Sequence, residues 1–78
     1  MNYSFTSAAR FMSMAMADLA YACTLDIIPE HKSKWVAQAH ANVALARQAN
    51  KNCNQHERRV LDAMQEDFLQ MEKDLKLV

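Results

Sequence analysis

The sequence predicts a small all-α protein, a three-helix bundle whose helices run up, down and up. The chain has no glycine and one proline, so almost nothing in it interrupts a helix. Apolar residues recur at the helical period in three segments, and no segment alternates as a strand does. Two short connections join these segments, which favours antiparallel neighbours. An elongated helical hairpin that dimerises is the alternative architecture.

The length of 78 residues indicates a single domain, residues 1–78. A domain of this size buries only a little more than about 60% of its unfolded surface. Its core gives limited stability, and self-association is a natural supplement.

The first helix is expected at about residues 4–25, with Ser4 or Thr6 as its cap. Its main apolar face consists of Phe5, Ala8, Met12, Ala15, Met16, Leu19, Ala22 and Cys23. A second apolar strip of Phe11, Met14, Tyr21 and Leu25 is interrupted by Asp18. Apolar residues on two sides predict burial by the rest of the chain on one side, and by the chain or a second copy on the other.

The second helix is expected at residues 29–50, because Pro29 pushes Ile28 out of the helical region and itself suits a first turn. Trp35 is its largest side chain and is expected to anchor one end of the core. Its main apolar face consists of Trp35, Val36, Ala39, Val43 and Ala46.

The third helix is expected at about residues 55–76, and Asn54 with Glu57 predicts a capping box at its start. Its apolar seam, spaced by three and four residues, consists of Leu61, Met64, Phe68, Met71, Leu75 and Val78. The carboxylates expected on its solvent side are Asp62, Glu66, Asp67, Glu72 and Asp74. Glu72 is expected to pair with Lys76.

Cys23 is expected in the core and Cys53 in an exposed loop, at opposite ends of a bundle about 30 Å long. They are too far apart to form a disulfide in one chain, and reduced thiols are expected. His56-Glu57 begins like a zinc-protease motif, but Val60 stands where its second histidine belongs. The expectation is therefore no enzyme, no metal site and no cofactor.

Nine basic and nine acidic residues balance overall, with a basic middle and an acidic end. This balance gives no global attraction to nucleic acid or to an anionic membrane. The most apolar stretch, residues 11–28, contains Asp18 and Asp26, so no membrane span is expected. The start of the chain lacks the pattern of a signal peptide, and a cytoplasmic protein is expected.

The predicted function is non-catalytic protein–protein interaction, as a small accessory or inhibitor subunit that docks on a larger complex or as a homo-oligomer such as a dimer. The residues predicted to contact a partner are Phe11, Met14, Asp18, Tyr21, Arg47, Arg58, Arg59 and Leu69. A nucleic-acid-binding module that uses the three arginines is the less favoured alternative. The chain also fits, by analogy of type alone, small bacterial or phage-encoded inhibitors of host or defence complexes and small secretion chaperones.

Overall fold

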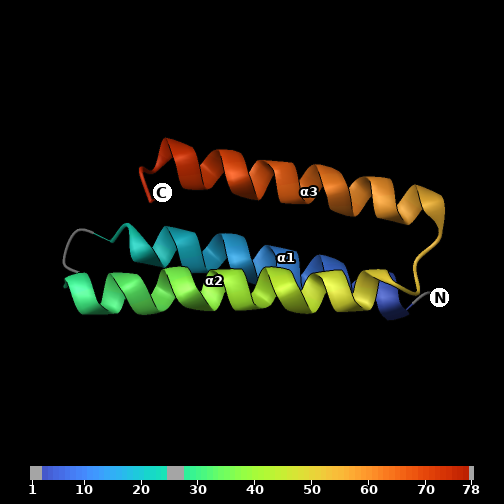
Figure 1. Cartoon of the computed structure of the whole chain (residues 1–78), viewed down its shortest axis with the longest axis horizontal. Helices are drawn as coiled ribbons and strands as arrows, with labels where there is room; N and C mark the ends of the chain where they lie inside the picture. The colour runs from blue at the N-terminus through green and yellow to red at the C-terminus, as the bar shows by residue number, and fades with distance from the viewer. Residues whose placement is uncertain (1–2, 25–27, 78) are drawn as a thin grey trace.

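The computed structural model describes residues 3–24 and 28–77 and shows three helices. Helix α1 spans Tyr3–Ala22, α2 spans Pro29–Asn50 and α3 spans Gln55–Asp74. They run up, down and up in a rod of 40 × 19 × 15 Å (Figure 1). The three-helix bundle predicted from the sequence is confirmed, with α1 in contact with both other helices.

Helices α1 and α2 form the most extensive contact in the molecule, and alanine explains it. On α1, Ala8, Ala15 and Ala22 recur every seventh residue and are fully buried. On α2, Ala39 and Ala46 keep the same spacing and are also buried. Side chains of this size let two helix backbones come close together. The first two helices therefore form a tight pair.

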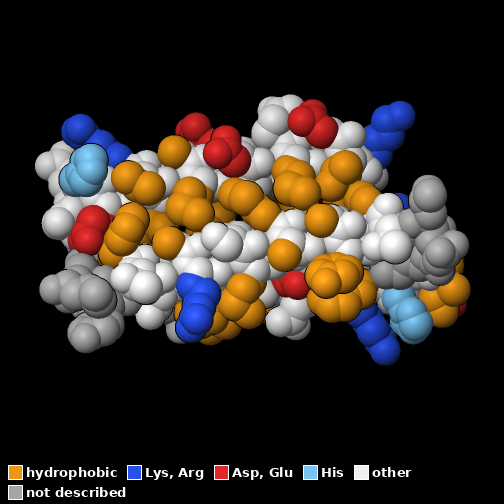
Figure 2. Space-filling view, turned by 180° about the vertical axis from the view of Figure 1, so that it is seen from behind, with side chains coloured by type: hydrophobic (Ala, Val, Ile, Leu, Met, Phe, Trp, Pro, Cys, Tyr) orange, Lys and Arg blue, Asp and Glu red, His pale blue; other side chains and the backbone are white. Residues whose placement is uncertain are grey.

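Helix α3 packs mainly against α1 and touches α2 much less. Its buried anchors are Leu61 and Phe68, which pack with Met12 and Leu19 of α1. Figure 2 shows hydrophobic side chains along the length of the molecule, below the upper helix α3. The partly buried side chains around this core include Phe5, Phe11, Met16, Met64, Met71 and Leu75. Larger side chains hold α3 further from its neighbours than alanines hold α2 from α1.

The helix ends follow local chemistry. Ile28 is extended (φ −81°, ψ 156°) directly before Pro29, where α2 begins. The capping box predicted at α3 is confirmed, because Asn54 Oδ1 accepts from the Glu57 amide at 2.8 Å and Glu57 Oε1 accepts from the Asn54 amide at 2.9 Å.

The other end of α3 closes in a Schellman arrangement around Lys76, which has a φ of 57°. The Leu77 amide donates to the Glu72 carbonyl at 2.9 Å, and the Lys76 amide donates to the Lys73 carbonyl at 3.1 Å. Lysine takes the position where glycine is usual. Helix α3 therefore ends at Asp74 and not at residue 76. Val78 of the predicted seam lies outside the described residues.

The predictions for both cysteines are wrong. Helix α1 ends at Ala22, so Cys23 leaves the helix and is exposed, while residues 25–27, with Leu25 of the second strip, lie outside the described part. Cys53 lies in the connection between α2 and α3, but its side chain is buried in the core. Its thiol contacts the Ala49 carbonyl oxygen at 3.7 Å. Both thiols are free. Burial raises the pKa of the Cys53 thiol above its ordinary value of 9.0, and the Glu57 carboxylate adds to the rise.

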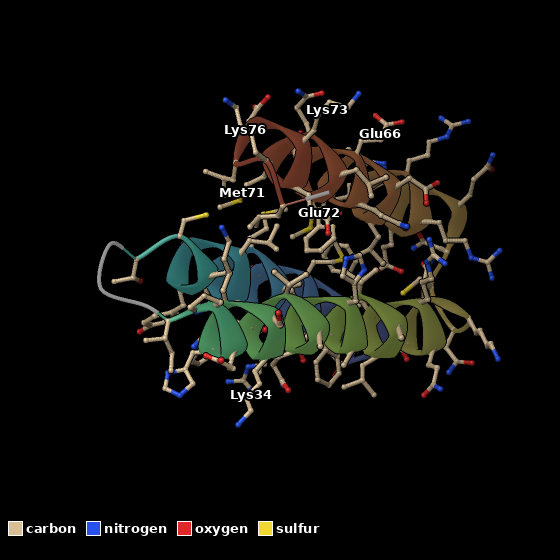
Figure 3. The ribbon with its side chains drawn as sticks, turned by 60° about the vertical axis from the view of Figure 1, so that its left-hand side comes forward. Lys34, Glu66, Met71, Glu72, Lys73 and Lys76 are labelled. Carbon is tan, nitrogen blue, oxygen red and sulfur yellow. The ribbon has the colours of Figure 1, made fainter. Side chains whose placement is uncertain are left out.

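The prediction for Glu72 is also wrong. This residue is 2% exposed, and its Oε2 lies 2.5 Å from Nε2 of His40 on α2. Position 72 is one turn after Phe68 and shares its buried side of α3. Figure 3 shows Glu72 facing the other helices, with Glu66 and Lys73 on the opposite side of α3. The carboxylate was expected in solvent because of its residue type, although its spacing places it inward.

Candidate protein-binding face

A hollow of about 700 Å³ lies between α1 and α2. It is lined by Met14, Asp18, His31, Lys34, Trp35, Gln38 and Asn42, and this set is called the outer groove below. None of the described residues of α3 lines the outer groove. It therefore lies on the side of the α1–α2 pair that α3 leaves uncovered.

The floor of the outer groove is a buried polar pair. Asn42 Nδ2 donates to Asp18 Oδ2 at 2.7 Å, and the two residues are 2% and 8% exposed. Because alanines bring α1 and α2 together, one side chain from each helix spans the seam. Among the described residues, no cation lies within ion-pair distance of the Asp18 carboxylate. The floor therefore carries a buried negative charge that one amide stabilises.

An aromatic pair stands at the edge of the outer groove: Trp35 lines the groove, whereas Tyr21 lines a separate hollow on α1. Tyr21 stacks on Trp35 with ring centroids 5.0 Å apart and an interplanar angle of 21°. Tyr21 remains 58% exposed, and Met14 is 43% exposed. The prediction that Trp35 anchors the core is wrong: it is only half-buried and stands at the groove, outside the core cluster. The aromatic pair stacks across the α1–α2 seam, and its outer side is open to solvent.

The rim of the outer groove is basic. His31 and Lys34, both exposed, come from the first turns of α2. Figure 3 shows Lys34 directed away from the other helices. No described ion pair includes Lys34 or His31. The groove thus combines an apolar wall, an acidic floor and positive charge at its edge.

Two other apolar residues predicted to contact a partner, Phe11 and Leu69, lie away from the outer groove. Phe11 is half-buried and packs against the core cluster, so it belongs to the molecule's own packing. Leu69 is 52% exposed on α3 and lines a different hollow, together with His40 and Phe68. The structure therefore brings Met14, Asp18 and Tyr21 together and leaves Phe11 and Leu69 elsewhere.

The three predicted arginines are exposed near the second connection, and two of them interact with their own chain. Arg58 Nη2 donates to the Lys51 carbonyl at 3.1 Å. The Arg47 guanidinium lies beside the Gln65 side-chain amide, which accepts a hydrogen bond from it when the amide is turned with its oxygen towards Arg47. Arg59 is exposed and forms no ion pair with any residue that the structure describes. Nucleic-acid binding by these residues stays a prediction.

Sequence reasoning missed Asn42, the partner of Asp18. Its signal was present, since Asn42 falls among Ala39, Val43 and Ala46 on the apolar side of α2.

Among the residues that the structure describes, no group of three histidine, cysteine or carboxylate side chains could hold a metal ion. Of the described helices, none has the length and hydropathy needed to cross a membrane.

Comparisons with known proteins identified no relative of this chain. No protein-family model, curated protein or solved structure matches the chain.

Proposed function

We propose that this protein acts by binding another protein, without catalysis, and that the outer groove with Tyr21 is the contact surface. The observation that supports the proposal is the exposed aromatic and methionine wall beside a groove between two helices. Tyrosine, tryptophan and methionine are enriched at the centres of protein interfaces. Helical pairs with such grooves accept an extended or helical segment of a partner.

The energetic argument concerns Met14 and Tyr21, which expose about half of their surfaces. Covering apolar surface contributes about 25 cal/mol per Å². Tyr21 and Trp35 have few rotatable bonds and are already stacked on each other, so they lose little side-chain entropy when a partner covers them. The groove therefore offers favourable burial at low ordering cost.

The state of Cys53 supports a non-catalytic role. A nucleophilic cysteine must be accessible and readily ionised. Cys53 is buried, and its pKa is raised. Its thiol contacts the Ala49 carbonyl. Of the neighbouring pair Cys53 and His56, at the second connection and in the first turn of α3, the cysteine is thus unsuited to attack a substrate.

The test is a double variant, Met14→Glu with Tyr21→Glu, compared with Leu69→Glu as a matched control on α3. A partner captured by the wild type is purified and its affinity measured by calorimetry. We expect the double variant to bind about a hundredfold more weakly, because two charges would be buried in the contact. Leu69→Glu should bind as the wild type does. Equal affinities for all three proteins, each folded by circular dichroism, would overturn the proposal.

A further inference from the structure

We propose that the occupant of the outer groove is a second copy of this chain, antiparallel to the first about a twofold axis at Met14. This inference rests on the proposed function of the same face and names its partner. It comes from the order of residues along α1 and from two charged side chains, Arg10 and Asp18, that form no ion pair among the described residues.

Five residues of α1 are arranged symmetrically about Met14. Arg10 and Asp18 stand four residues before and after it, and Ser7 and Tyr21 stand seven residues before and after it. Offsets of four and seven keep residues on one side of a helix. A twofold axis through Met14 places position 10 of each copy opposite position 18 of the other, and position 7 opposite position 21. The pattern is that of a self-complementary contact.

The charges make this pairing favourable. Arg10 is exposed, and neither Arg10 nor Asp18 forms an ion pair among the described residues. Arg10 and Asp18 are eight positions apart, about 12 Å along the helix axis, so they do not pair with each other within one chain. Across the axis, each guanidinium reaches the Asp18 carboxylate of the other copy. The contact contains this ion pair twice.

The groove also suits a guanidinium in shape. The Asp18 carboxylate uses one oxygen to accept from Asn42, and both Asp18 and Trp35 line the hollow. A planar guanidinium fits between a carboxylate and an aromatic surface better than an ammonium does. His31 and Lys34 also line the hollow, but Lys34 is directed into solvent (Figure 3). The incoming Arg10 therefore meets an opposite charge at the floor.

The size of the protein favours the same occupant. A chain of 78 residues buries a small core. Pairing two α1–α2 layers converts each into half of a four-helix arrangement and covers Met14 and Tyr21 of both copies. The two α3 helices remain on the outside, because α3 lines no part of the groove.

The first experiment measures solution mass by light scattering across a dilution series under reducing conditions. The wild type should be a dimer, and Arg10→Glu should raise its dissociation constant about a hundredfold, since like charges then face each other. Asp18→Asn should weaken the dimer while still accepting from Asn42. Arg59→Glu, an exposed arginine on α3, is the matched control and should leave the mass unchanged.

The second experiment tests the axis by cross-linking. In a Cys23→Ser background, Met14→Cys should form a disulfide dimer on mild oxidation, because equivalent positions on a twofold axis meet. Ser13→Cys, exposed but about 100° around the helix, should not. The second-copy proposal is overturned if the wild type stays monomeric. It is also overturned if the wild type dimerises but Arg10→Glu leaves the dissociation constant unchanged and Met14→Cys forms no disulfide dimer. The proposed function falls separately, if Met14→Glu with Tyr21→Glu leaves all protein binding unchanged.

Discussion

At the residue scale, the pair of Asp18 and Asn42 determines the character of the outer groove. The Asp18 carboxylate is buried in the α1–α2 seam beside small alanine side chains, and the Asn42 amide, 2.7 Å away, takes the place of water that hydrates an exposed carboxylate. Asp18 could be singled out from the sequence because it interrupts an apolar strip. Asn42 stands out in the same way on the apolar side of α2, but its pairing with Asp18 could not be predicted, because it depends on how α1 and α2 are aligned along their axes.

The loss of Asn42 should therefore destabilise the fold. Asn42→Ala leaves the buried Asp18 carboxylate without a donor, and we expect the free energy of unfolding to fall by about 1–3 kcal/mol. Urea unfolding followed by circular dichroism measures the change. Gln38→Ala, one turn earlier on the groove and exposed, is the control and should cost less than about 0.5 kcal/mol. Equal losses would show that the Asp18–Asn42 bond contributes nothing specific.

Two of the errors at this scale, those for Glu72 and Cys53, share one cause. Glu72 and Cys53 were placed by residue type, a charge outward and a loop cysteine outward, and both are buried. Glu72 is held by His40 from a helix 32 positions away, a contact that no local pattern reveals. Cys23 fails for a different reason, since the helix stops one residue before it.

At the scale of elements, helix positions were predictable because their signals are local. Pro29 marks the start of α2, and Asn54 with Glu57 marks the start of α3. The predicted ends of α1 and α3 extend beyond the observed ones, since helix ends depend on tertiary contacts as well as on sequence. The apolar faces were also correct in their central positions, from Ala8 to Leu19 and from Leu61 to Phe68.

The close approach of α1 and α2 leads to a prediction about alanine. Ala15→Leu adds three carbons at a fully buried position of the seam, and overpacking should lower the free energy of unfolding by about 1–3 kcal/mol. Ala20→Leu, an exposed alanine on the same helix, is the matched control. Its leucine has nearly the same helix propensity as alanine, so little change is expected. Thermal unfolding of both variants that differs by no more than error would contradict a tight α1–α2 seam.

At the scale of the whole molecule, α1 has two apolar sides, and α3 covers only one of them. Helix α3 covers the side of Met12 and Met16, and the side of Met14 and Tyr21 stays open beside α2. The sequence predicted both strips but could not say which of them α3 covers, because that depends on how the three helices pack in space. Which side of α1 stays uncovered is therefore known from the structure and not from the sequence.

The central claim is that protein covers the outer groove, and Trp35 reports on it directly, because it is the chain's single tryptophan and lines that groove. The measurement is Trp35 fluorescence and its quenching by iodide across a dilution series, run beside the solution mass. As the mass rises to that of a dimer, the emission should move to shorter wavelength and quenching should fall, and Met14→Glu should abolish both changes. A dimer that forms while Trp35 emission and quenching stay constant would contradict the account.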